Sequence, residues 1–292
     1  MTISIGLIPN KDLVMLMQDS EGTLLNLMLT QDIMNKIKQV NDQAIAGVIG
    51  NPYSADEVLE KLAKKNYDSA INLREGLENA FHEVREKKFR DGVLRKYGFS
   101  HIREITSPAT PIDEGVKRII LEKNDKDGLG ARLMLCSNYK KPEIYTVGYP
   151  GEGHLVTGVK VGDFSGSGTI KSVDIVGSAL EEYKWETSLN KKQAVHVLLK
   201  AAIGSKKHEG VGGIFDLKYL EKVDDKSKII TLEPRKLNMA LYALEHKASD
   251  ETVSDCIDKV LDDKVKYGEV ASYLKEKKSF GSEFDEYFGL DK

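Results

Sequence analysis

The chain has 292 residues, of which 40% are apolar and 30% are charged, and its formal net charge is −3. This length allows one large domain or two smaller ones, and this composition is typical of a globular protein with a sizeable core. An acidic balance without a basic stripe argues against binding to nucleic acid or to an anionic membrane surface. The longest apolar runs are too short to span a bilayer, and Cys136 and Cys256 form no metal-binding pattern. With no signal-peptide pattern at the N-terminus, we expect a cytoplasmic protein that needs no cofactor and no structural metal.

Short β-leaning segments fill the first fifty residues, and turn residues separate them. In chain order these segments are 2–8, 12–17, 23–30, 33–40 and 43–50. Ser54 with Glu57 forms a capping-box pattern that predicts a helix over 54–65, and a long charged helix is expected over 68–97. The signal then weakens, and the stretch EKNDKDGLG at 122–130 is interpreted as a turn-rich connector.

Strand patterns return after this stretch. We expect strands at 131–138, 142–150, 154–163, 213–222 and 228–233, and helices at 179–185 and 191–203. Everything after Pro234 is interpreted as a polar, helical C-terminal extension, residues 234–292, on a core of residues 1–233 that carries an insert at about 84–130. Strands that come in runs favour antiparallel sheets. The chain is therefore assigned to the α/β (α+β) class, as a four-layer αββα sandwich of two stacked, mainly antiparallel sheets.

Several chemistries are excluded by missing motifs. The chain has no GxxxxGK[ST] phosphate loop, no HExxH zinc motif and no GxSxG nucleophile elbow. What remains is Thr2, which removal of Met1 would leave with a free α-amine. A hydroxyl is a weak nucleophile that needs a base, and an α-amine with a pKa of about 8 can serve in the same residue.

Such a nucleophile also benefits from a nearby cation that a carboxylate holds in place. Asp19 ends the second expected strand, and Lys36 lies in the segment NKIKQV that leads to the strand at 43–50. Taken alone, an aspartate at a strand end is usually a turn residue, and a lysine in such a strand is usually solvated. The two residues are candidates on spacing alone.

At this point the chain resembles the proteasome β-subunit/HslV group of N-terminal nucleophile hydrolases. TISIGLIPNKDLVMLMQDS is similar to the opening of the family, NKIKQV to its lysine-bearing strand, and AIAGVIGNPYSADEVLEKL to its AG-x-x-G strand and following helix. VGS, LNKKQAVHVLLKAAI and VGGIFDLKYLEK resemble its second half. The resemblance covers about residues 2–66 and 174–222. Glu21 and Val211 depart from it, since the family usually has arginine and serine there.

The resemblance implies a site, an activity and partners. Thr2 would be the nucleophile, with Asp19 and Lys36 in support. Ser178 would support the amine (Val176 in an alternative alignment), Glu209 would be a second acidic residue, and backbone near Gly47–Gly50 would bind the oxyanion. The implied activity is a threonine-type peptidase that acts on a peptide or protein through an acyl-enzyme, and the implied assembly is a homo-oligomer such as a ring. The alternatives are a non-catalytic homologue that serves assembly or binding, and an α/β binding protein unrelated to the family.

Overall fold

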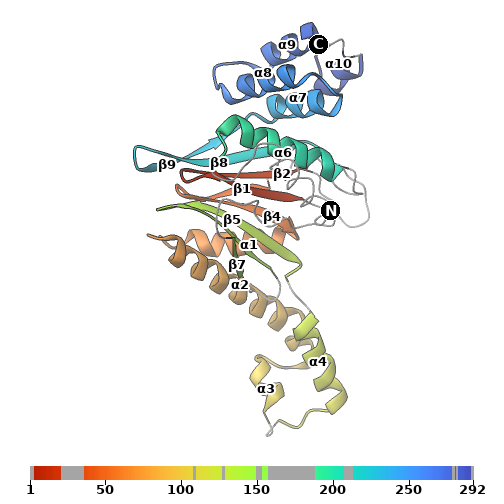
Figure 1. The fold of residues 1–292 in the computed structure, drawn as a ribbon. Helices are drawn as coiled ribbons and strands as arrows, with labels where there is room; N and C mark the ends of the chain where they lie inside the picture. Colours follow the sequence, from red (N-terminus) through yellow and green to blue (C-terminus); the bar gives the residue numbers. More distant parts are fainter. Residues whose placement is uncertain are drawn as a thin grey trace.

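The protein folds into two antiparallel sheets with helices outside them (Figure 1). The computed structural model describes residues 3–20, 36–107, 110–126, 129–148, 153–156, 188–206, 213–277, 280 and 282–290. The first sheet has the strand order β1-β2-β8-β9, namely Ser4–Asn10, Leu13–Asp19, Phe215–Val223 and Lys226–Thr231. The second sheet has the order β3-β4-β5-β6-β7, namely Ile37–Asn41, Ala44–Gly50, Ala131–Asn138, Pro142–Val147 and Gly153–Val156. The prediction of two antiparallel sheets is confirmed.

Alternation along each strand sorts the side chains into three apolar layers, because successive strand residues point to opposite faces. The layer between the sheets contains Val14 and Leu16 of β2, Ile45 of β4 and Met134 of β5. The odd-numbered residues of β2, from Leu13 to Met17, point the other way and join a larger core under the helices. Both faces are therefore buried along β1, β2, β4 and β5, which explains why these strands are mainly apolar, whereas β3 and β9 carry partly exposed polar residues.

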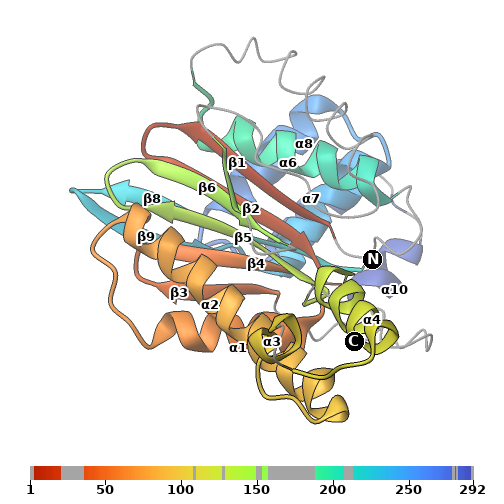
Figure 2. The ribbon, with the colours of Figure 1, turned by 90° about the horizontal axis from the view of Figure 1, so that it is seen from below.

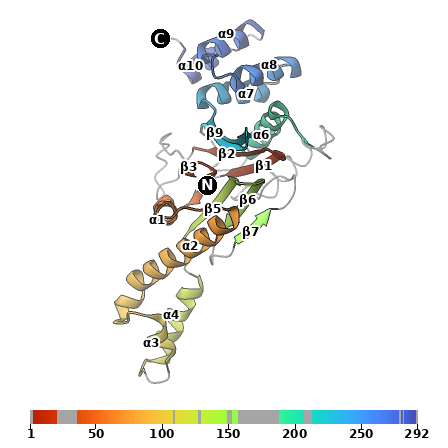
Figure 3. The same cartoon turned by 90° about the vertical axis from the view of Figure 1, so that its left-hand side faces the viewer.

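Helices cover the outer face of each sheet, and Figures 2 and 3 show both helical layers from other sides. The second sheet packs on α1 (Pro52–Ala63) and α2 (Ala70–Gly92). The first sheet packs on α6 (Lys191–Lys206), and the C-terminal helices follow, of which the first two contact α6 and the third packs on those two. Those helices are α7 Pro234–Glu245, α8 Asp250–Leu261, α9 Tyr267–Lys277 and α10 Ser282–Phe288.

Two expectations about these helices need correction. The capping box at Ser54 is wrong, because α1 begins earlier: Asn51 is the N-cap, and its side chain accepts a hydrogen bond from the Ser54 N–H at 3.2 Å. Pro52 follows at the first helical position, where its missing N–H costs nothing. The C-terminal helices are also less uniformly polar than expected, since each has apolar residues that belong to the core on the outer, helix-covered face of the first sheet.

The region 84–130 is an arm that projects from the second helical layer (Figure 1). After α2 it contains a 3₁₀ turn η1 (Leu94–Tyr97), α3 (Ile102–Thr106) and α4 (Glu114–Lys126). The long helix expected over 68–97 is therefore α2 followed by η1, and its end before Gly98, whose φ is 81°, is confirmed. The connector expected at 122–130 is wrong in its first half, because α4 continues to Lys126.

Tertiary packing explains the extra helix. The fully buried Ile120 of α4 packs in a small apolar cluster with Phe89, Val93, Leu94 and Ile105. Those partners precede Ile120 by fifteen residues or more in the sequence and lie outside α4, so a local pattern in 114–126 does not show them. The arm thus has a core of its own.

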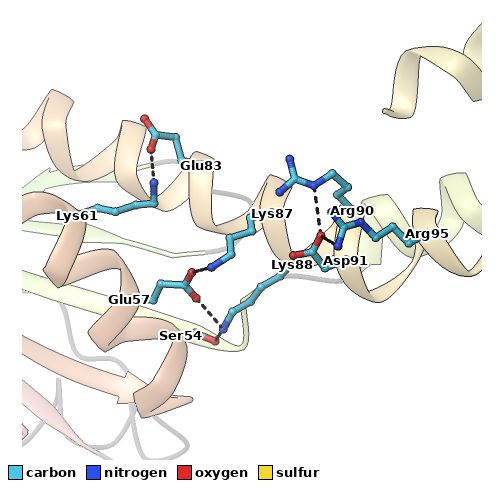
Figure 4. A network of polar contacts seen from close by, with 9 residues as sticks. All are labelled: Ser54, Glu57, Lys61, Glu83, Lys87, Lys88, Arg90, Asp91 and Arg95. Atoms are coloured by element: carbon cyan, nitrogen blue, oxygen red, sulfur yellow. Dashed lines mark hydrogen bonds and ion pairs between the residues drawn. The ribbon is translucent and has the colours of Figure 1, made fainter. Parts of the chain in front are cut away.

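Ion pairs tie α2 to α1 at the base of the arm (Figure 4). Lys61 lies 2.6 Å from Glu83, and Lys87 lies 2.6 Å from Glu57. Lys88 donates to the Ser54 hydroxyl at 2.6 Å. The hydrogen bond from Lys87 is the main reason that the pKa of Glu57 lies below its usual range. The charged side chains of these pairs are 26–57% exposed, whereas Ser54 is buried.

Candidate functional site

Four strand ends meet at one edge of the two sheets, and the candidate charged residues lie there. Asp19 is the last residue of β2, and Lys36 immediately precedes β3. The Lys36 Nζ is 3.6 Å from Asp19 Oδ1, and the backbone N–H of Ile3 donates to the same oxygen at 2.8 Å. Asp19 and Lys36 are 1% and 7% exposed, so this is a buried ion pair.

Burial dominates the electrostatics of Asp19. It raises the pKa of the carboxyl to about 6, although the Lys36 charge and the Ile3 N–H act in the opposite direction. The second oxygen, Oδ2, is buried and has no hydrogen-bond partner among the residues that the structure describes. A buried carboxylate oxygen without a donor is costly. The arrangement therefore suits a further donor at Oδ2.

The backbone around Lys36 is held by both sheets. The Lys36 carbonyl accepts from the Val48 N–H at 3.1 Å, which joins β3 to β4. The next carbonyl, that of Ile37, accepts from Lys218 Nζ of the other sheet at 2.7 Å. The amide of Gln18 donates to the Val48 carbonyl and also crosses between the sheets. Lys36 is thus fixed relative to Asp19 by contacts on either side.

The two sheets approach each other closely at Gly47. A Cβ at this position would lie 2.6 Å from Ser4 Oγ and 3.0 Å from Gln18 Oε1, so only glycine fits without a shift. Gly47 lies inside β4, opposite Ile37 on one side and Met134 on the other. Its clearest role is to let β1 and β2 lie against β4.

Gly50 occupies a different environment at the end of β4. Its φ is 81°, and a Cβ there would lie 2.2 Å from the Gly130 carbonyl oxygen, so a side chain is excluded on both grounds. Gly130 also accepts from the Asn51 N–H at 2.8 Å. Gly50 therefore lies at the exposed rim of the sheet edge that carries Lys36, next to the start of β5.

Sequence reasoning missed two charged residues at this edge. Asp216 and Lys218 alternate on β8, and their place in the strand directs both toward the second sheet. Burial raises the pKa of Asp216, against the Lys218 and Lys36 charges, and burial lowers the pKa of Lys218. The signal was available, since FDLKYLEK places two opposite charges on one face of a predicted strand.

The remaining predicted residues are distributed as follows. Asp19 and Lys36 are in contact, and Gly47 and Gly50 lie on the neighbouring strand β4. Thr2, Ser178 and Glu209 lie outside the described residues. Within the described part of the chain, no group of three or more His, Cys, Asp or Glu side chains could hold a metal ion. In that same part, none of the helices combines the length and apolar character that crossing a membrane requires.

Comparison with known proteins adds no identification. No model of a known protein family matches the chain, and no curated protein matches it.

Proposed function

We propose that the protein is a divergent, proteasome-like N-terminal threonine hydrolase that cleaves a peptide or amide bond through an acyl-enzyme on Thr2. The observation that carries the proposal is the position of Asp19. Its Oδ1 accepts from the N–H of Ile3, the residue bonded to Thr2, and the same oxygen pairs with Lys36. The buried carboxylate therefore links the backbone next to Thr2 to a buried cation.

The chemistry follows from this linkage. With Met1 removed, the Thr2 hydroxyl attacks the substrate carbonyl while the α-amine takes its proton. Lys36, held by Asp19, lowers the pKa of that hydroxyl by its positive charge. Within the stretch Gly47–Gly50 the oxyanion is received at the exposed end of β4, at the Gly50 N–H, since the Val48 N–H already donates to the Lys36 carbonyl and Gly47 is paired on both sides within the sheet.

The tetrahedral intermediate formed by attack of the Thr2 hydroxyl on the substrate carbonyl then collapses. The C–N bond of the substrate breaks, the leaving amine takes the proton from the α-amine, and an ester on Thr2 remains. Water hydrolyses this ester and restores the enzyme; an amine in place of water would give transfer of the acyl group instead. No redox partner or metal is needed for either outcome.

Intact mass spectrometry after incubation with a hydroxyl-reactive β-lactone tests the proposal. A mass that lacks Met1 and carries one adduct, absent in Thr2→Ala, is the expected result. Thr106→Ala, which changes an exposed threonine of the arm, is the matched control and should react like the wild type. A protein that keeps Met1 and stays unlabelled would instead support the alternative, a non-catalytic homologue in which the Asp19–Lys36 pair only fastens strand ends together.

A further inference from the structure

The arm (residues 84–130) contains a cavity that the proposed hydrolysis does not use. The cavity has a volume of about 680 Å³ and lies between the second half of α2 and the segment 100–104. Its charged lining includes Arg85, Arg90 and Arg103, and its apolar lining includes Phe89, Leu94 and Ile102. This volume lies within the range of ligand sites, and seven of the ten lining residues are polar or charged, which favours a charged ligand over an apolar one.

The arm is locally basic in an acidic protein. Residues 85–105 contain seven Lys or Arg and only three Asp or Glu, whereas the whole chain has a net charge of −3. Arg103 is exposed, and its guanidinium forms no ion pair with any residue that the structure describes. Of the acidic residues that line the cavity, Glu104 accepts from the backbone N–H groups of Ser100 and His101, at 3.4 and 3.1 Å.

Arg90 is engaged on one side only. Its Nε lies 3.3 Å from the neighbouring Asp91, which also pairs with Arg95 at 3.2 Å. Figure 4 shows the terminal nitrogens of Arg90 turned away from Asp91. Such a guanidinium edge can donate two parallel hydrogen bonds to one carboxylate.

After the arm, the chain returns to the sheet edge that carries the candidate site. The chain returns from α4 into β5 at Gly130, whose carbonyl contacts the residue after Gly50. Gly50 is two residues beyond Val48, the partner of the Lys36 carbonyl.

We propose that the arm cavity binds an acidic peptide segment, with Arg90 and Arg103 holding its carboxylates and the apolar wall holding its neighbouring side chains. Binding of the peptide does not depend on the proposed hydrolase activity, whereas a role of this binding in substrate selection rests on the proposed function. Glu86 and Glu104 in the lining, together with the negative charge of the whole chain, oppose the continuous phosphate backbone of a nucleic acid.

Fluorescence anisotropy with the full chain tests this. The probe is a short labelled peptide of alternating Leu and Glu, and the comparison is the same peptide with Gln in place of Glu. The double variant Arg90→Gln/Arg103→Gln should bind the Glu peptide at least about tenfold more weakly, since each lost charge-assisted contact contributes roughly one factor of ten. Arg118→Gln removes one exposed charge from α4, outside the cavity, and should change affinity less than about twofold.

Equal binding of the Glu and Gln peptides, or an unchanged double variant, would refute the inference. Preference for single-stranded DNA over the Glu peptide would refute it in favour of nucleic acid. Circular dichroism checks that the variants keep their helices. Binding of the Glu peptide is also measured in Thr2→Ala, so that it is tested without any hydrolysis. If the Glu peptide binds but the β-lactone does not react with the wild-type protein, only the hydrolase proposal fails. If the reverse holds, only the arm proposal fails, and if both hold, the double variant should raise KM for the Glu peptide and leave kcat unchanged.

Discussion

Two of the ion pairs in the described part of the chain, one at the sheet edge and one between α1 and α2, differ in their surroundings. At the sheet edge, Asp19 and Lys36 are almost completely buried and 3.6 Å apart. Between α1 and α2, Lys61 and Glu83 are closer, at 2.6 Å, but their side chains are 34% and 57% exposed. Although the Lys61–Glu83 contact is shorter, its interaction energy is smaller, because water and salt screen the two charges.

The difference in burial between the two ion pairs indicates which of them is a candidate for function. Solvated pairs such as those in Figure 4 cost little to form and contribute little. Burial of Asp19 and Lys36 costs several kcal/mol per ion before their attraction offsets it, so apolar residues of similar size would stabilise the edge as well or better. A buried pair at a strand edge, in contact with the backbone of Ile3, is thus a candidate for chemistry rather than for stability.

The largest expected effect is that of Lys36→Met. It leaves the Asp19 carboxylate buried without its cation, and we expect a loss of about 3–5 kcal/mol in the free energy of unfolding at pH 8. The loss should shrink as the pH falls and Asp19 becomes protonated, and this should begin above pH 6, because the variant lacks the Lys36 charge that lowers the pKa of Asp19 in the wild type. Urea denaturation at several pH values measures it. The double variant Asp19→Asn/Lys36→Met is the control and should recover much of the loss; no recovery would mean that the two residues are not coupled.

The titration of Asp19 should also be visible in the wild type. Its folded pKa of about 6 lies above the unfolded value of 3.8, so the folded state binds the proton more tightly. Its contribution to stability is therefore fully present below pH 4 and is lost as the pH rises through 6, on the order of 3 kcal/mol across this window.

Comparison with Asp19→Asn isolates this contribution, because the variant cannot titrate. The stability difference between wild type and variant should change between pH 4 and 6, and Asp263→Asn, at an exposed position, should run parallel to the wild type. If the protein is an active hydrolase, its rate should rise with pH through about 6, as Asp19 becomes charged and holds Lys36. A difference that stays constant over this range would contradict a raised pKa.

Gly47→Ala should have a smaller effect. Its Cβ would meet Ser4 Oγ at 2.6 Å and push the sheets apart next to the buried pair. We expect a loss of about 1–3 kcal/mol, measured by thermal or urea unfolding. Gly92→Ala is the matched control, because no atom lies within 4 Å of its added Cβ. Similar effects of both substitutions would show that the close contact is not the cause.

The smallest effect is expected at the exposed pair. A double-mutant cycle with Lys61→Met and Glu83→Gln should give a coupling close to the error of the measurement, and high salt should remove what remains. A coupling comparable to that of Asp19 and Lys36 would overturn the comparison between the two pairs.

The sequence by itself determined most of the elements, because strand and helix periods and turn residues act locally. The strand at Ala131–Asn138 was predicted with its bounds, and the helix after Asn190 was predicted from its start at Lys191. The order of runs of strands and helices predicted two antiparallel sheets. Asp19 and Lys36 could be singled out as candidates, since Asp19 ends the second expected strand and Lys36 lies in the segment that leads to the strand at 43–50.

Only the tertiary structure decided what these residues do to one another. The approach of Lys36 to Asp19, the burial that raises the pKa of Asp19, and the place of Asp216 and Lys218 depend on how the sheets stack. The helix α4 and the cavity of the arm likewise depend on contacts between segments that are distant in the sequence. The physical reason is the same in each case: desolvation and packing depend on every neighbour in space, and a local sequence pattern contains only the neighbours along the chain.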